Sequence, residues 1–205
     1  MTQRTLMILV AVALVLGGLA VAEASRVRYP GNDVGYEPEQ PIAYSHKLHA
    51  GDLGIQCLYC HHGAERSKNA GIPSASVCMN CHKAITARWD TVRPEVEAAK
   101  KEGREPRRIV APELQKLYDA FDARRPIEWV QVHKMPDFVT FEHRAHVNAG
   151  VACEACHGPI KTMERVRQVS SLSMGWCIDC HRGGSVAKAN GVTTQASIDC
   201  GTCHR

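Results

Sequence analysis

Five copies of the pattern Cys-x-x-Cys-His are the residues of this 205-residue chain with the clearest chemistry. Two thiols three residues apart can form thioether bonds to the two vinyl groups of one porphyrin, and the adjacent His can bind its iron, so the pattern is typical of c-type haem attachment. The copies consume all ten cysteines: Cys57, Cys60 and His61; Cys78, Cys81 and His82; Cys153, Cys156 and His157; Cys177, Cys180 and His181; Cys200, Cys203 and His204. The sequence therefore predicts five covalently bound haems c.

Other uses of paired cysteines do not fit this pattern. Zinc sites do not require a His directly after each pair, and five pairs do not divide evenly into four-ligand sites. A redox-active Cys-x-x-Cys of the thioredoxin type occurs once per domain in a βαβ setting, which the sequence lacks. Haem attachment is the interpretation that remains.

A low-spin haem needs a second axial donor, usually His or Met. Six histidines lie outside the motifs and could supply it: His46, His49, His62, His133, His143 and His146. His143 and His146 would lie one turn apart on the same side of a helix, so they could serve two neighbouring haems.

The composition bounds the remaining possibilities. Aromatic residues make up only 5% of the chain, and strongly periodic strands are scarce, so we expect the haem rings to form much of the core. The formal charge of +4 omits the haem propionates, which would bring the loaded protein close to neutral or acidic. Basic residues are scattered, so no nucleic-acid partner is expected.

Residues 6–22 form an uncharged apolar run of seventeen residues. This length is at the lower limit for a membrane span and long for a signal peptide, and small residues at 20–24 resemble a cleavage site. We expect a membrane anchor, with a removed signal peptide as the alternative. Because haem c is attached outside the cytoplasm, the haem-bearing part should lie on the periplasmic side of the cell membrane.

An internal repeat organises the rest of the chain. Residues 41–62 align with residues 137–158, so that His46, His49 and Tyr44 match His143, His146 and Phe141. The predicted parts are an N-terminal anchor or signal peptide (1–28), an extended linker (29–40), a dihaem module (41–82), a helical linker (83–134) and a trihaem module (135–205). Residues 111–125 have apolar residues at helical spacing and a Pro at the start, so they predict an amphipathic helix. It could pack across the two modules or dock a partner.

The tandem modules resemble class III multihaem cytochromes, and the fuller pattern is similar to the pentahaem cytochrome c subunits of alternative complex III. The resemblance rests on the split of two and three motifs, on PIEWVQVHKMPDFVTFEHRAH and on LSMGWCIDCHR, and covers residues 40–205. It implies a mostly irregular fold with short α-helices, two class III-like haem modules and one transmembrane helix. The partners that it implies are an iron–sulfur/molybdopterin-like subunit, a polytopic quinol-binding subunit, and a soluble cytochrome c, a copper protein or an oxidase as acceptor.

The class III pattern also implies ligand pairs. It would give His46 to the Cys57 haem and His143 to the Cys153 haem, with His49 and His146 reaching the second haem of each module. Related modules place a donor just before the penultimate motif, where this chain has Met174, and no His lies between His181 and Cys200. Met174 is therefore expected on the Cys200 haem, with Met163 and then Met135 as alternatives. His62 and His133 remain open, either as ligands or as hydrogen-bonding residues.

Three functions remain to be distinguished. The favoured one is a non-catalytic electron-transfer subunit of a quinol-oxidising respiratory complex. A free-standing periplasmic carrier would require removal of the apolar segment. A multihaem reductase would require one haem with an open axial position, and the surplus of histidines argues against such a site.

Overall fold

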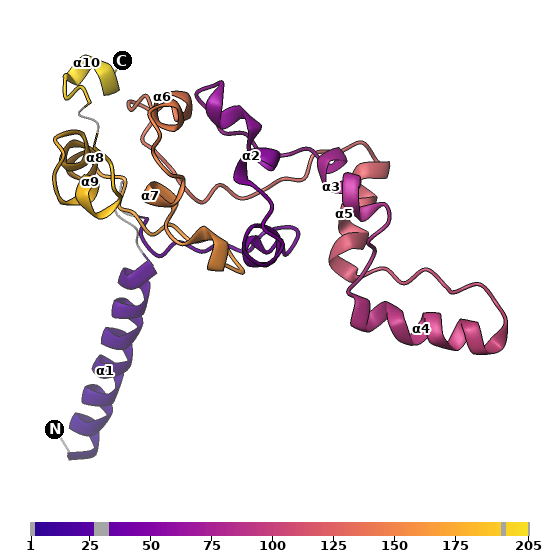
Figure 1. Cartoon of the computed structure of the whole chain (residues 1–205). Coiled ribbons are helices and arrows are strands. Elements are labelled where there is room, and N and C mark those ends of the chain that lie inside the picture. Colours follow the sequence, from indigo (N-terminus) through magenta and orange to yellow (C-terminus); the bar gives the residue numbers. More distant parts are fainter. Residues whose placement is uncertain (1–2, 27–32, 194–195, 205) are drawn as a thin grey trace.

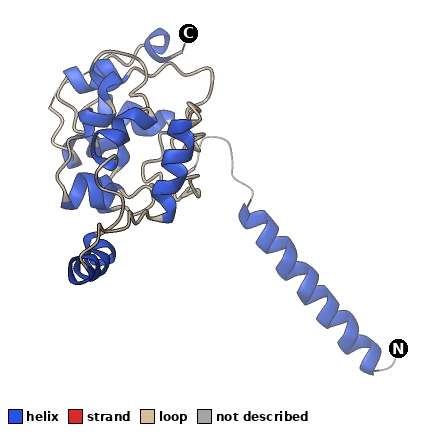
Figure 2. Cartoon of the chain, turned by 90° about the vertical axis from the view of Figure 1, so that its right-hand side faces the viewer, coloured by secondary structure: helices blue, strands red, loops and turns tan. Residues whose placement is uncertain are grey.

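The computed structural model of the chain describes residues 3–26, 33–193 and 196–204, with the side chains of 20–26 excepted. Within these residues the secondary structure is helical and no strand is present (Figures 1 and 2). The elements are α1 (Gln3–Arg26), the π-helix η1 (Lys47–Asp52), α2 (Cys57–Cys60), the 3₁₀ helix η2 (His62–Glu65), α3 (Ala75–His82), α4 (Trp89–Glu102), α5 (Pro112–Asp122), α6 (His143–Asn148), α7 (Glu154–His157), the 3₁₀ helix η3 (Ile160–Thr162), α8 (Met174–His181), α9 (Ser185–Ala189) and α10 (Cys200–Cys203).

The Cys-x-x-Cys-His motifs lie in or at the ends of five short helices, α2, α3, α7, α8 and α10. Residues three and four apart share one face of a helix. Each motif therefore places two thiols and an imidazole on the same side of its helix, as attachment to one ring requires.

The polypeptide core is thin, as the composition predicted. Among the described residues the buried apolar side chains are few: Ala64, Ala99, Leu117, Tyr118, Val132, Ile160, Met163 and Ala187. The chain exposes 14669 Å² of surface. A compact protein of this mass would expose roughly 9,500 Å². The projecting helices α1 and α4 account for part of the excess.

The motif helices follow one another across the molecule. In Figure 1 α10 lies above α8 on the left, and α7, α2 and α3 follow toward the right. The haem-free segment with α4 and α5 extends beyond α3. Main-chain hydrogen bonds join the two halves of the repeat, since His143 N donates to Lys68 O at 3.2 Å and Arg144 N donates to Ser67 O at 3.1 Å. Thr140 N donates to Cys203 O at 2.7 Å and ties α10 to the start of the second half.

The predicted helix in the linker is present as α5, which begins with Pro112 in the first turn. Its contacts are with the first half of the chain: α5 packs on α3, and the Tyr118 hydroxyl donates to His82 O at 2.5 Å. The charged stretch before it also forms a helix, α4, although Pro94 removes one intrahelical donor. Gly103, at φ 66°, ends α4 in the left-handed conformation that glycine adopts readily.

The apolar N-terminal run is helical and forms most of α1, whose described side chains are exposed. The predicted membrane anchor is not supported, because no helix among the described residues has the length and apolar character needed to cross a bilayer. Of the expected extended linker, residues 33–40 have no regular secondary structure apart from a turn at 34–35, and residues 29–32 lie outside the described part of the chain.

Candidate haem centres

Four histidines of the motifs each face a histidine of a His-x-x-His segment across a gap of about one metal atom. The pairs, with the distance between ring centroids and the angle between ring planes, are His46–His61 (6.4 Å, 6°), His49–His82 (6.2 Å, 60°), His143–His157 (6.4 Å, 10°) and His146–His181 (6.0 Å, 43°). These are the pairs that the class III resemblance implied.

The gaps fit an iron atom bound by both rings. A metal–imidazole bond is about 2.0–2.1 Å long and a ring nitrogen lies roughly 1.1 Å from the ring centre, so two imidazoles on opposite sides of one metal have centroids roughly 6 Å apart. The observed values of 6.0–6.4 Å match this spacing. Each motif carries its two thiols in the same helical turn as its imidazole, so the residues present fit a covalently attached haem.

Hydrogen bonds at Nδ1 orient most of these rings. Three motif histidines lie with Nδ1 2.7–2.9 Å from a main-chain oxygen, and so do three of the facing histidines: His61 with Gly71, His82 with Ile85, His181 with Ser197, His49 with Ser45, His143 with Lys68 and His146 with Glu142. Because an imidazole whose Nδ1–H donates to a carbonyl keeps its lone pair on Nε2, each ring is left with one nitrogen free for a metal.

Two of the paired rings are strongly shielded from water. Burial, with the neighbouring imidazoles of His61 and His49, lowers the pKa of His46 to about 4. Burial, with the imidazoles of His133 and His143, lowers the pKa of His157 to about 3. Both rings are therefore neutral near pH 7, which is the form that binds a metal.

One aromatic ring holds each His-x-x-His segment in place. Tyr44 stacks on His49 at 4.4 Å and meets His46 edge-on at 4.9 Å. In the second half, Phe141 lies 4.5 Å from His146 and meets His143 edge-on at 5.0 Å. The repeat aligned these two aromatic residues, but their role in fixing both imidazoles of a segment was not expected.

Neighbouring thiols show how the five motifs follow one another. Burial raises the pKa of six cysteine thiols. In four of them a cysteine of a neighbouring motif raises the pKa further: Cys78 acts on Cys60, Cys57 on Cys153, Cys180 on Cys156 and Cys203 on Cys177. This sequence of neighbours agrees with the order of helices in Figure 1. The motifs thus form a row that runs from the Cys78 motif through those of Cys57, Cys153 and Cys177 to that of Cys200. An exposed cysteine lies at each end, Cys81 and Cys200.

The fifth motif differs from the others. Among the ring contacts of residues 33–193 and 196–204, His204 is paired with Phe138 at 5.9 Å and with no second imidazole. Met174, the expected donor, is the first residue of α8 and is 61% exposed. Met163 is buried beside η1, where its carbonyl accepts from Lys47 N at 2.9 Å. Ligation of the Cys200 haem by Met174 remains a prediction.

The two histidines that the sequence left open lie in different surroundings. His62 is exposed at the start of η2. His133 is half-buried, with its Nε2 3.3 Å from Nδ1 of His157 and the two rings edge-on at 4.4 Å. Burial, followed by the neighbouring His143, lowers the pKa of His133. His133 therefore lies behind a motif histidine rather than across a gap from one.

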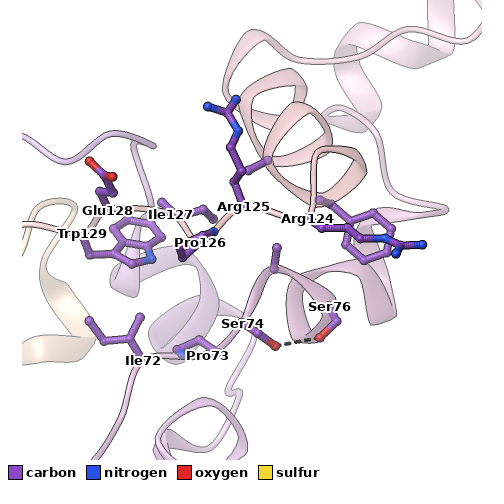
Figure 3. Close-up of a pocket in the computed structure, with 13 residues that line it drawn as sticks. Ile72, Pro73, Ser74, Ser76, Arg124, Arg125, Pro126, Ile127, Glu128 and Trp129 are labelled. Carbon is purple, nitrogen blue, oxygen red and sulfur yellow. Dashed lines mark hydrogen bonds between the residues drawn. The ribbon is translucent and has the colours of Figure 1, made fainter.

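A cavity of about 730 Å³ lies at the α3 end of the row (Figure 3). Its walls come from the segment before α3, the end of α5 and residues 124–129, and they include Ile72, Pro73 and Trp129 together with Arg124 and Arg125. Ser74 and Ser76, whose hydroxyls are 2.7 Å apart, line the side that leads to the Cys78 motif. The end of the row at α3 thus adjoins a hollow whose lining is partly apolar and includes Arg124 and Arg125.

Comparisons with known proteins agree with this geometry. Residues 139–205 match the family described as cytochrome c7 and related cytochrome c, and residues 77–158 match cytochrome c554 and c-prime. The chain is also 32% identical, over 121 residues, to the multihaem cytochrome c subunit of menaquinone reductase from Nitratidesulfovibrio vulgaris. That alignment covers 59% of this chain and 47% of the relative, so the chain spans about half the length of the curated relative that it matches. The two matched segments are therefore similar to cytochrome c families, which implies covalently bound haem c.

Proposed function

We propose that this chain is a non-catalytic electron-transfer subunit that carries electrons along a row of five covalently bound haems c. The observation that carries the proposal is the set of four imidazole pairs 6.0–6.4 Å apart on helices that follow one another across the molecule. Each haem supplies one-electron chemistry, by cycling between ferric and ferrous iron. The chain holds the rings in sequence and closes both axial positions of at least four of them.

The proposed attachment and ligand sets follow the geometry. The Cys78 and Cys57 haems would take the pairs His82/His49 and His61/His46, and the Cys153 and Cys177 haems would take His157/His143 and His181/His146. His204 would bind the Cys200 haem, with Met174 as its proposed partner. Two imidazoles on one iron leave no position for a substrate, which favours an electron carrier over a multihaem reductase.

The proposed setting is a quinone-linked membrane complex. The support is the relative from Nitratidesulfovibrio vulgaris, which is a subunit of a menaquinone reductase, together with the resemblance to alternative complex III. The proposed partners are an iron–sulfur/molybdopterin-like subunit and a polytopic quinone-binding subunit, with a soluble cytochrome c, a copper protein or an oxidase at the far end. Because haem c is attached outside the cytoplasm, the subunit would act on the periplasmic side.

The direction of electron flow has two candidates. The resemblance to alternative complex III implies that quinol reduces the haems, whereas the name of the relative implies that the haems reduce menaquinone. Rapid mixing of the isolated complex with a menaquinol analogue, and of the pre-reduced complex with the corresponding quinone, separates the two. If haem reduction by the menaquinol analogue is the faster of the two reactions, quinol is the electron donor. If haem oxidation by the quinone is faster, the haems reduce the quinone.

The proposal itself is tested on the mature protein. Intact mass should exceed that of the processed polypeptide by five haem groups, and the ferric protein should show low-spin signals throughout its electron paramagnetic resonance spectrum. A mass that accounts for fewer haems would mean that the row contains fewer than five of them. A high-spin signal that responds to cyanide or nitrite in the unmodified protein would favour the reductase instead.

A further inference from the structure

We propose that His133 tunes the haem of the Cys153 motif, by accepting the hydrogen bond of its motif ligand His157 and thereby lowering the reduction potential of that haem below the value that a main-chain acceptor would give. The inference rests on the proposed function, because it requires a haem between His157 and His143. His133 is a positioning residue here, since it acts on iron through another side chain.

The contrast among the five motif histidines carries the inference. In four of them the partner of Nδ1 is a main-chain carbonyl oxygen: that of Gly71 for His61, of Ile85 for His82, of Ser197 for His181 and of Phe138 for His204. His157 differs, because its Nδ1 lies 3.3 Å from Nε2 of a side chain, His133. The two rings are edge-on, at 82°, with their centroids 4.4 Å apart.

The roles of donor and acceptor follow from iron binding. When Nε2 of His157 binds a metal, Nδ1 must carry the proton, so His157 donates and His133 accepts through the Nε2 lone pair. An acceptor behind a ligating His raises the basicity of that ligand. An imidazole nitrogen is a more basic acceptor than an amide oxygen, so the effect should be larger at His157 than at the other four histidines.

A more basic ligand favours the ferric state. The hydrogen bond strengthens when the donor is bound to the more highly charged ferric iron, because hydrogen bonds to charged groups are stronger than those between neutral groups. Hydrogen bonding around axial ligands is one of the means by which a protein sets haem potential. The Cys153 haem should therefore hold its electron less tightly than a haem with a carbonyl acceptor in the same surroundings.

The surroundings of His133 suit this role. Its neighbour Val132 is buried, and the main-chain carbonyl of His133 accepts from the Gln131 side chain at 3.0 Å. Residue 133 lies in the linker between α5 and α6, outside the two repeated modules. These contacts hold that part of the linker behind His157. The linker thus supplies a side chain to the third and central motif of the row.

The consequence is a low-potential haem in the middle of the row. Electrons would rest on the haems to either side and cross the centre in a brief uphill step. This arrangement separates the dihaem end from the C-terminal end without breaking the row.

The test compares His133→Leu and His133→Gln with the parent protein and with His62→Leu, which changes an exposed histidine outside the pairs. Each is prepared with its haems attached, and its midpoints are measured by optical and paramagnetic resonance titration. In His133→Leu we expect the midpoint potential of one haem to rise. At a fixed potential the ratio of reduced to oxidised haem should increase about tenfold, which corresponds to 59 mV for a one-electron couple. His133→Gln, whose amide oxygen can accept, should give a smaller rise, and His62→Leu none.

Two results would overturn the inference. One is a His133→Leu protein with five low-spin haems and unchanged midpoints, which would leave the proposed electron-transfer function intact. The other is an equal rise from His133→Leu and His62→Leu, which would show a general effect of lost charge or structure. Absence of low-spin haem from the parent protein would instead refute the proposed function.

Discussion

Replacing Gly63 by Ala should disturb two neighbouring haem sites through one backbone turn. Gly63 lies two residues after the motif histidine His61, and residues 67–71 fold back beside it. A β-carbon at position 63 would lie 2.7 Å from Asn69 O and 2.8 Å from Ala70 O. The φ angle of Gly63 is not positive, so Ala is acceptable to the local backbone and the collision is the main effect.

The size of the effect follows from the distances. Ordinary contact begins at 3.4 Å, so Asn69 O must recede by up to 0.7 Å. If the turn moves as one body and directly away from His143, the separation between His143 Nδ1 and Lys68 O grows from 2.9 Å to about 3.6 Å, which no longer counts as a hydrogen bond. Loss of that bond costs about 1 kcal/mol in the positioning of His143. The bond from His61 to Gly71 O lies in the same turn and should weaken as well.

The assay is the ferric paramagnetic resonance spectrum together with intact mass. We expect a high-spin fraction to appear in Gly63→Ala while the mass still accounts for every haem, because thioether attachment does not need the facing histidine. The matched control is Gly175→Ala in α8, where a β-carbon meets nothing within 4 Å and Ala favours the helix. An unchanged low-spin spectrum in Gly63→Ala, or an equal change in both variants, would show that this turn does not position the ligands.

Three further predictions concern other parts of the chain. His46→Ala and His143→Ala should each convert one haem to a high-spin form with no loss of haem mass, and a missing haem group would contradict the proposed roles. Met174→His should lower the highest midpoint in a redox titration and Met163→Leu should not; if neither substitution lowers it, Met174 does not bind the Cys200 haem. In the haem-free segment, Arg104 and the amide of Arg107 donate hydrogen bonds to Glu95 and lower its pKa to about 2. The stabilisation that these bonds give the folded segment is complete above the ordinary pKa of 4.5 and is lost as the pH falls through 2. Glu95→Gln should therefore speed tryptic cleavage near Arg104 at pH 7 relative to the exposed control Glu97→Gln, and equal rates would contradict this role.

The haem-binding pattern could be predicted from the sequence because it is local. A motif of five residues in one helical turn needs no distant contact to place two thiols and an imidazole together. The helix at Pro112 was likewise predicted from its own apolar spacing and first residue. The alignment of Tyr44 with Phe141 anticipated that the two halves share a design, although not that each ring would pack on two histidines.

The relations between modules could not be predicted in the same way. Lys68 O supports His143 across 75 residues, and a main-chain carbonyl leaves no signature in the sequence. His133 was one of two unassigned histidines, and only its 3.3 Å approach to His157 distinguishes it from the exposed His62. A helical linker was predicted for 83–134, but the bounds of α4 within it could not be, because Pro94 and a charged composition obscure the helical pattern.

The turn at residues 67–71 shows how the row is held together. Its carbonyl oxygens support His61 in one half of the repeat and His143 in the other, so one loop positions ligands of two adjacent haem sites. His133 then reaches the other side of the same junction, behind His157. Substitutions at this junction should therefore act on two haems and combine non-additively, because they share partners, whereas substitutions at the two ends of the row should act on one haem each. The continuity of the row thus depends on the five attachment motifs and also on the few backbone and side-chain groups that link the dihaem and trihaem modules.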